Sequence, residues 1–307
     1  MALTLTALRL LARSHAQNPF EGPVLTFGRQ AIIATLADCE AAIREAGLEP
    51  HPLPPEIPRG PNVPAFQTGP TSAFTNDVCF FWLLCGSRIE TLDVSDYEDA
   101  DHIHDLNRPI PDALKDRFGL VIDGGTMEHV FDVAQVLRNI KALVREGGRV
   151  IHMNPMNNWA EHGYYQISPT LYHDFYVTNG FAFSECLVIG VRRGSAEGMY
   201  DGRSGAWRWS PERPSAQITS REMLTTFFEA KKVEKVADRI PQQGEAASGA
   251  SSSQLGGTAR AGGGLGRAKA RLLETVPSAG WAVLIAKRLL GRDLSSKPWG
   301  LEHVGRF

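Results

Sequence analysis

The stretch from residue 118 to residue 155 constrains the fold most, because it has the pattern of a complete βαβ unit. Residues 120–122 form a short apolar run that ends at an acidic loop, which is typical of a strand covered on both faces. Apolar positions then recur at helical spacing over 133–144, the pair Gly147-Gly148 breaks the helix, and a second apolar strand follows over 150–153. The chain therefore belongs to the α/β class.

Polar residues follow the first of these strands at once, beginning with Asp123-Gly124-Gly125 and continuing to Glu128 and His129. In open α/β sheets, ligands bind beyond the carboxyl ends of the strands. We therefore expect the chemistry of the protein to be located at these residues.

The order hydrophobic-Asp, Glu-His-Val, amphipathic helix, Gly-Gly and a strand ending in Pro resembles the second half of a class I S-adenosylmethionine-dependent methyltransferase. The small-molecule branch of that family often carries Leu-Glu-His where this chain has Met127-Glu128-His129. The resemblance covers about residues 20 to 192. It implies a Rossmann-like, doubly wound sheet of about six or seven strands, with S-adenosyl-L-methionine as the cofactor.

Further elements are predicted on both sides of the βαβ unit. The predicted strands cover 24–27, 89–94, 102–106 and 183–191, and the predicted helices cover 3–16, 30–46, 71–86 and 220–237. Seven prolines between residues 49 and 70 exclude a helix or a central strand there and predict a long loop.

Composition divides the chain of 307 residues into four parts. We predict a methyltransferase-like α/β domain over 1–195, a loop and helix extension over 196–241, a flexible Gly/Ser/Ala linker over 242–266 and a basic amphipathic helix region over 267–307. From Ala230 onward the chain has 13 Lys+Arg against 6 Asp+Glu. This basic helical appendage suits an anionic surface, a membrane surface or a protein partner, or it is a solvated tail without a partner.

The resemblance assigns the donor's amino-acid end to the turn after the first strand, where the family has Asp/Glu-x-Gly-x-Gly. The aligned residues here are Thr26-Phe27-Gly28-Arg29-Gln30, which keep only Gly28. Arg29 and Gln30 are therefore expected either to hydrogen-bond the donor carboxylate or to close the pocket.

The other donor contacts implied by the resemblance are a carboxylate for the ribose, at Asp93, and residues facing the adenine, at Asp105 and Leu106. Asp123 and Gly124 would border the methyl group. Each has a structural alternative: Asp93 would cap the turn that follows it, Asp105 would form a turn with Asn107, and the glycines would make a tight turn.

A hydroxyl acceptor must lose a proton, and histidine is the usual base near neutral pH. His129 and His162, with Asp123, are the catalytic candidates. The substrate-contact candidates are Glu128, Tyr164, Tyr165 and His173. The cysteines lack zinc-site spacing, and no metal site is predicted.

The sequence thus predicts a small-molecule methyltransferase, with a saccharide or secondary-metabolite hydroxyl as the expected acceptor. A catalytically inactive binding or assembly module with the same fold is the alternative. An oxidoreductase is weaker because no GxGxxG motif is present. The net charge of −2 argues against a nucleic-acid partner. No leader pattern or apolar run of ~18 residues is found, so a cytoplasmic location, with peripheral membrane contact left open, is expected.

Overall fold

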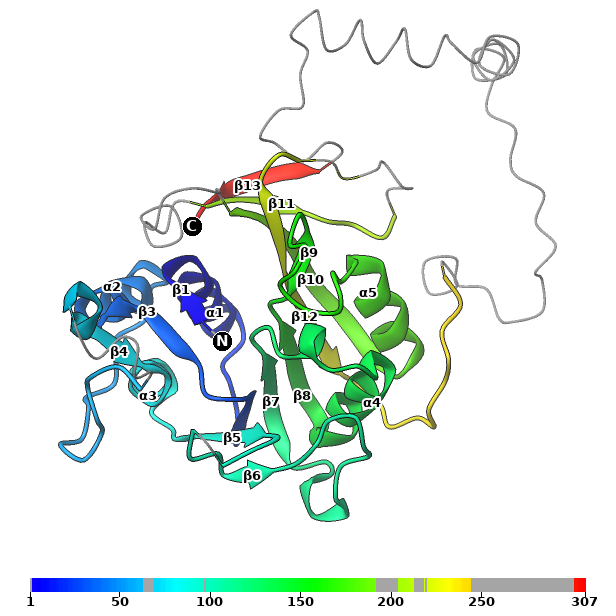
Figure 1. Ribbon diagram of the computed structural model, residues 1–307, viewed down its shortest axis with the longest axis horizontal. Coiled ribbons are helices and arrows are strands. Elements are labelled where there is room, and N and C mark those ends of the chain that lie inside the picture. The colour runs from blue at the N-terminus through cyan, green and yellow to red at the C-terminus, as the bar shows by residue number, and fades with distance from the viewer. Residues whose placement is uncertain are drawn as a thin grey trace, which may run out of the picture.

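The computed structural model describes residues 2–62, 69–96, 98–191, 204–212, 218, 220–243 and 301–307. Within these residues the protein has a mixed α/β fold built on a ten-stranded sheet (Figure 1). The strands in spatial order are β13 (Glu302–Arg306), β11 (Gly205–Arg208), β10 (Phe181–Val191), β12 (Met223–Lys232), β8 (Val144–His152), β7 (Phe118–Asp123), β2 (Val24–Phe27), β5 (Ile89–Asp93) and β6 (His102–Ile103), with β9 (Pro155–Asn157) beside β12.

The chain reverses its direction of travel across the sheet between β2 and β7. From β2 it proceeds outward to β5 and β6, then returns to β7 and β8, and all of these strands are parallel. β12 is antiparallel to both of its neighbours, β8 and β10. The point between β2 and β7 is therefore the topological switch point, where open α/β sheets bind their ligands.

Helices cover both faces of the sheet, so the predicted doubly wound architecture is confirmed (Figure 1). One face carries α1 (Leu5–Gln17), α2 (Leu36–Glu45) and α3 (Asp77–Cys85), and the other carries α4 (Val133–Leu143) and α5 (Pro169–Thr178). A small second sheet of β1 (Ala2–Thr4), β3 (Ala31–Thr35) and β4 (Phe74–Asn76) joins the first layer, and short 3₁₀ turns occur at Gly69–Ala73, Asp112–Leu114 and Met127–His129.

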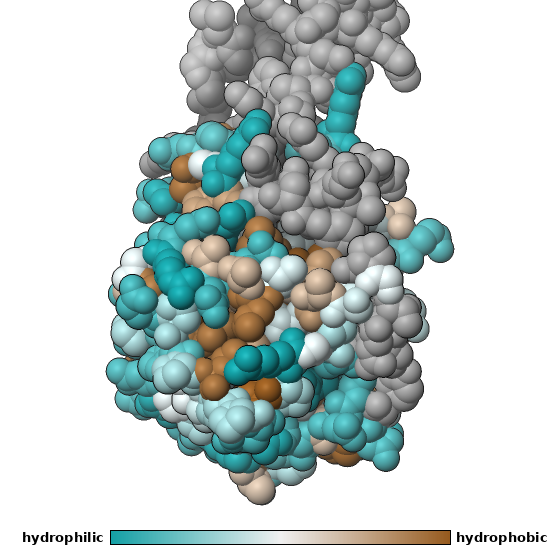
Figure 2. All heavy atoms as spheres, turned by 90° about the vertical axis from the view of Figure 1, so that its left-hand side faces the viewer, coloured by the Kyte–Doolittle hydropathy of each residue, from teal (hydrophilic) through white to brown (hydrophobic). Residues whose placement is uncertain are grey.

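Alternation along β7 explains the two layers. Leu120 and Ile122 pack into the core beneath α1–α3, whereas Val121 between them packs into the core beneath α4 and α5. Successive side chains of a strand point to opposite faces, so an unbroken apolar run fills both cores. Figure 2 shows that apolar groups also come to the surface in the middle of the α1–α3 side, with polar groups around them.

The predicted helix over 30–46 is wrong in its first part. Residues Ala31–Thr35 form β3, which pairs with β1 and β4, and α2 begins only at Leu36. The β-branched residues Ile32 and Ile33 suit a strand, and Thr35 starts the helix because its side chain and that of Asp38 form a capping box.

The predicted helix over 220–237 is also wrong, because Met223–Lys232 form the central strand β12. The run LTTFF within it has high strand propensity, and both of its edges are paired, with β8 and β10. The main sheet therefore continues beyond the domain boundary predicted at residue 195.

The Pro-rich segment is without helix or strand over 49–62, as predicted.

The predicted linker (242–266) lies outside the described residues except for its first two, and the basic helix region (267–307) lies outside them up to residue 300. Residues 301–307 carry β13, which pairs with β11 rather than extending a helix. There the Phe307 carbonyl accepts a hydrogen bond of 2.9 Å from Thr6 Oγ1, and Arg13 lies over the Phe307 ring. None of the described helices combines the length and the apolar character that crossing a membrane requires.

Gly119 in β7 offers a test of the packing at the start of this strand. A Cβ atom at this position would overlap the carbonyl oxygen of Glu21, so the two backbone segments approach as closely as they do only because residue 119 is glycine. We expect Gly119→Ala to lower the free energy of unfolding by about 3 kcal/mol in urea denaturation. Gly60→Ala is the control, because a Cβ there meets nothing within 4 Å. Equal stability of the two variants would contradict this account.

Candidate functional site

The site begins at the end of β7, where the side chain of Asp123 is fully buried. Its Oδ1 accepts hydrogen bonds from the backbone N–H groups of Gly125 (3.3 Å), Thr126 (2.8 Å) and Met127 (3.2 Å). These bonds fold the chain into the turn that carries Glu128 and His129. Asp123 therefore positions the candidate catalytic residues instead of facing an open cleft.

The second oxygen of Asp123 joins a buried network that reaches β8 and α5. It lies 2.9 Å from His152 Nδ1 and accepts a hydrogen bond of 2.9 Å from Asn154 Nδ2. His152 Nε2 in turn lies 2.7 Å from the hydroxyl of Tyr176. Burial alone would raise the pKa of Asp123, but these hydrogen bonds and the attraction of His152 outweigh it and lower the pKa. Asp123 is therefore a buried carboxylate.

Glu128 lies next to this carboxylate, and its pKa shifts in the opposite direction. Its Oε2 accepts a hydrogen bond of 2.9 Å from Asn154 Nδ2, and Tyr172 donates a bond of 2.6 Å to Asn154 Oδ1. Burial, followed by repulsion from Asp123, raises the pKa of Glu128 to about 8. Its Oε1 is buried and has no hydrogen-bond partner among the described residues.

His129 and His162 face that free oxygen of Glu128. The distance from Glu128 Oε1 is 3.9 Å to His129 Nε2 and 3.7 Å to His162 Nε2. Burial, followed by repulsion from His162, lowers the pKa of His129, which keeps its imidazole neutral near neutral pH. Both rings are partly exposed, with 44% and 40% of their side chains accessible.

The loop that carries His162 is attached to the turn that carries Glu128. The backbone N–H groups of Tyr164 and Tyr165 donate to the Glu128 carbonyl at 2.8 and 3.2 Å. A Cβ atom on Gly163 would lie 2.9 Å from that same oxygen, so only glycine allows this close approach. The three functional side chains are thus held together by backbone contacts.

A cavity of about 440 Å³ opens beside this cluster. Its walls come from the small second sheet, the carboxyl ends of β7 and β8, and the strands β10 and β12. The residues that matter for its chemistry are Glu98, Gly124, Gly125, Glu128, Trp159, His162, Thr225 and Thr226. The volume is within the range of small-molecule sites, and most of the lining is apolar.

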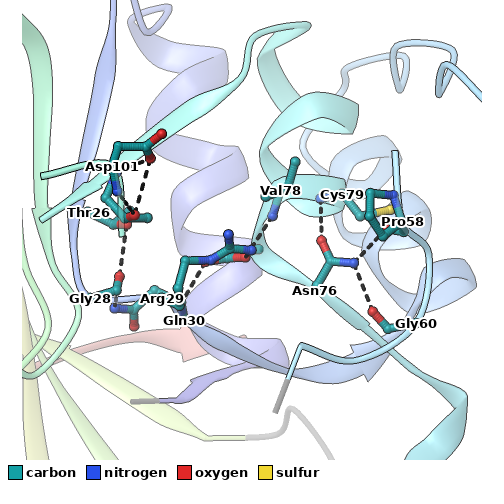
Figure 3. A network of polar contacts seen from close by, with 12 residues as sticks. Thr26, Gly28, Arg29, Gln30, Pro58, Gly60, Asn76, Val78, Cys79 and Asp101 are labelled. Atoms are coloured by element: carbon teal, nitrogen blue, oxygen red, sulfur yellow. Dashed lines mark hydrogen bonds and ion pairs between the residues drawn. The ribbon is translucent and has the colours of Figure 1, made fainter. Parts of the chain in front are cut away.

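The structure places the predicted donor loop differently from the family pattern (Figure 3). Gln30 is fully buried, and its Nε2 donates to the carbonyls of Phe27 (2.9 Å) and Gly28 (3.2 Å). Arg29 forms two bonds to Asp77, of 2.6 and 3.0 Å. Neither side chain therefore projects freely into a pocket.

Gln30 occupies the crevice between the ends of β2 and β7. A Cβ atom on Gly124 would lie only 2.5 Å from Gln30 Oε1, so the two residues are in close contact at the switch point. Gln30 Oε1 is itself buried and has no hydrogen-bond partner among the described residues. The crevice thus contains an amide in place of the second glycine of the family pattern.

The other predicted donor residues lie apart from the cavity. Asp93 accepts a hydrogen bond of 3.1 Å from Ser95 N, so it caps the turn that follows it, as in the structural alternative given above. Its other oxygen lies beside Gly28. Asp105 accepts two bonds from Asn107, of 2.9 and 2.8 Å, and Leu106 is buried in the core beneath α4 and α5. Of the cofactor candidates, Gly124 lines the cavity described above.

The predicted substrate residues separate into two groups. Tyr164 is exposed against Phe131, and the Tyr165 hydroxyl donates to the Phe131 carbonyl at 2.7 Å, so both lie near His129 and His162 on the outside. His173 is buried on α5 between Phe183 and Trp209. It packs the helix against the sheet and does not line the cavity.

Sequence reasoning missed the network residues. His152 and Asn154 alternate at the end of β8, and Tyr172 and Tyr176 are four residues apart on α5. Polar residues at alternate positions of a strand end, and aromatic hydroxyls on one helical face, were the available signals. They become informative only when β8 and α5 are known to meet beside Asp123.

No family model matches the sequence, and no curated protein matches it. Similar solved structures include the trans-methyltransferase CalH in complex with SAH, at 11% identity and a TM-score of 0.34, covering 76% of this chain and 57% of that one. They also include YcgJ from Bacillus subtilis, at 12% identity and a TM-score of 0.38, covering 74% and 98%. A branched-chain polyamine synthase from Thermus thermophilus is similar at 13% identity and a TM-score of 0.36, covering 77% and 58%. These are remote similarities of fold.

The buried network makes a prediction about stability. Tyr176→Phe removes the partner of His152 Nε2, and both side chains are fully buried, so we expect the free energy of unfolding to fall by about 1–3 kcal/mol. Tyr164→Phe is the matched control, because that hydroxyl belongs to a side chain that is 69% exposed, and its effect should stay within about 0.5 kcal/mol. Urea denaturation of both variants measures the difference. Equal effects would mean that the network does not stabilise the site.

Proposed function

We propose that this protein is an S-adenosylmethionine-dependent methyltransferase that acts on a hydroxyl of a small molecule. The observation that carries the proposal is the cavity of about 440 Å³ at the carboxyl ends of β7 and β8, next to the switch point of the sheet. Ligands of open α/β sheets bind at this place. The resemblance of residues 118–155 to the second half of class I methyltransferases names the donor.

The residues present fit the donor, although not through the glycine loop of the family. Gln30 does not itself line the cavity, but its Oε1 is a buried acceptor without a hydrogen-bond partner among the described residues and lies against Gly124, which does line it. The ammonium group of an amino-acid moiety is a hydrogen-bond donor that would satisfy such an atom. Asp93 lies apart from the cavity, and its second oxygen lies beside Gly28, so it would accept from a ribose hydroxyl only in a donor that extends from the cavity along Gly28. When bound, the donor supplies a methyl group on a positively charged sulfur.

The acceptor would lie against Glu128, His129 and His162. A neutral imidazole takes a proton from a hydroxyl, and His162 is the histidine that lines the cavity. His129 lies beside it, with ring centroids 5.2 Å apart, and its lowered pKa favours the neutral imidazole. The raised pKa of Glu128 makes its carboxyl group a hydrogen-bond donor near neutral pH, able to hold an acceptor oxygen. Thr225 also lines the cavity, but its hydroxyl donates to the Asn154 carbonyl at 2.8 Å, so it would offer a polar substrate an acceptor only.

A second candidate function, an inactive binding or assembly module, is favoured by one specific observation. Gln30 and its bonds to the carbonyls of Phe27 and Gly28 fill the crevice where the family's glycine turn receives the donor. In this case the cavity would bind a different small molecule, and Gln30 would exclude S-adenosylmethionine.

Calorimetry with S-adenosylhomocysteine separates the two candidates. We expect the unmodified protein to bind this ligand and Asp93→Asn to bind it about 10- to 100-fold more weakly, because hydrogen bonds to charged groups contribute about 1.5–3 kcal/mol. Asparagine retains an oxygen for the bond to Ser95, so the turn is preserved. No heat at millimolar ligand would exclude the methyltransferase.

Gln30→Gly gives opposite results under the two functions. If Gln30 Oε1 accepts a hydrogen bond from the donor, the substitution weakens S-adenosylhomocysteine binding by about tenfold. If Gln30 excludes the donor, the substitution opens the crevice, and binding appears in the variant alone. We expect weaker binding, and a gain of binding would support the inactive module instead. The melting temperature of the variant, measured in parallel, shows whether it is folded.

A further inference from the structure

We infer that Glu128, His129 and His162 form a binding site for a first-row divalent transition-metal ion. The inference concerns the cluster beside the cavity and does not rest on the identity of the methyl donor. The sequence led us to expect no metal site, because the expectation was based on cysteine spacing. The structure instead groups a carboxylate with two imidazoles, and their potential ligand atoms all lie within 4.8 Å of one another.

The free oxygen of Glu128 is the observation that points to a ligand. Its side chain has 0% of its surface exposed, and Oε1 has no hydrogen-bond partner among the described residues. A buried polar atom without a partner costs about 1–3 kcal/mol, so an atom kept in this state needs an explanation. A cation bound between Glu128 Oε1 and the two imidazoles would satisfy it.

The ligand atoms lie close to the separations that a bound ion requires, but not yet at them. Nitrogen and oxygen ligands bind such ions at about 2.0–2.2 Å, which places neighbouring ligand atoms about 3.4 Å apart. The observed distances from Glu128 Oε1 are 3.9 Å to His129 Nε2 and 3.7 Å to His162 Nε2. The ligand atoms of the two imidazoles lie within 4.8 Å of each other, so binding an ion would move the imidazoles together by up to about 1 Å, and their partial exposure allows this.

A second shell already holds these ligands in place. Asn154 Nδ2 fixes Glu128 Oε2, and Tyr172 fixes Asn154 in turn. The His162 loop is held to the Glu128 carbonyl by the N–H groups of Tyr164 and Tyr165, and Trp159 packs near His162 with ring centroids 5.0 Å apart. Partners of this kind orient the first-shell ligands of metal sites. Hydrogen bonds to neighbouring residues therefore fix the positions of the cluster's side chains.

The number and type of ligands indicate the ion and its use. Two imidazoles and one carboxylate suit zinc, iron or manganese, and three protein ligands leave coordination positions for other molecules. Glu128 and His162 line the cavity, so these positions face it. The occupant of the cavity would then coordinate the ion through an oxygen atom, such as a hydroxyl or carboxylate. With an ion present, Glu128 would bind as a carboxylate after releasing its proton, the two histidines would act as neutral ligands, and the ion would take over the activation of that oxygen.

Metal titration of the untagged, full-length protein tests the inference. The protein is stripped with EDTA, desalted and titrated with Zn²⁺ by calorimetry, and with Co²⁺ by visible absorption. We expect one ion per chain and a Co²⁺ spectrum typical of mixed nitrogen and oxygen ligands. His129→Ala, His162→Ala and Glu128→Gln should each weaken Zn²⁺ binding by more than about tenfold. His303→Ala, an exposed histidine on β13, should leave it unchanged.

Each outcome of this titration is decisive. An absence of one-to-one binding, or binding that survives both His129→Ala and His162→Ala, would overturn the inference. Because Glu128 is buried, Glu128→Asp is measured with Glu128→Gln, and circular dichroism confirms that the variants are folded. The titration contains no S-adenosylhomocysteine, so a failure of metal binding leaves the proposed methyltransferase untouched, and the reverse also holds.

Discussion

The buried carboxylate of Asp123 is the group on which the rest of the site depends. One of its oxygens is saturated by three backbone N–H groups, which fixes the turn after β7. The other joins β7 to β8 and, through His152, to α5. A charge in such a place is stable only when fully hydrogen-bonded. Burial, followed by repulsion from Asp123, raises the pKa of the neighbouring Glu128, so Asp123 affects both the shape of the site and its charge.

The fold was predictable where the decisive pattern is local. The βαβ unit over 118–155 follows from apolar runs and helical spacing, and the structure confirms its order of strand, helix and strand. The glycine turn was wrong in place, because the helix ends at Leu143 and Gly147-Gly148 lie inside β8. β3 and β12 were missed for a different reason. Each is a strand because of partners distant in the chain, β1 and β4 for β3, and β8 and β10 for β12. Strand propensity depends strongly on such context.

The candidate site follows the same rule. Glu128 and His129 were identified because they adjoin the strand end, and His162 because it lies in the loop after the next strand. Their grouping depends on Gly163 and on the Glu128 carbonyl, which no spacing in the sequence reveals. The donor loop shows the opposite case. The sequence showed that Gln30 replaces the second glycine of the family pattern. The structure shows the result, because the Gln30 side chain is buried between the ends of β2 and β7.

The pairing of β13 with β11 has a consequence for how the chain can be shortened. Residues 302–306 complete the edge of the sheet, and Phe307 is bonded to Thr6 and packed under Arg13 of α1. Truncation after β12 would therefore uncover β11 as a bare edge strand, which invites pairing with other chains. It would also release the first helix from its contact with the last residue. A shortened chain therefore needs residues 301–307 to keep both contacts.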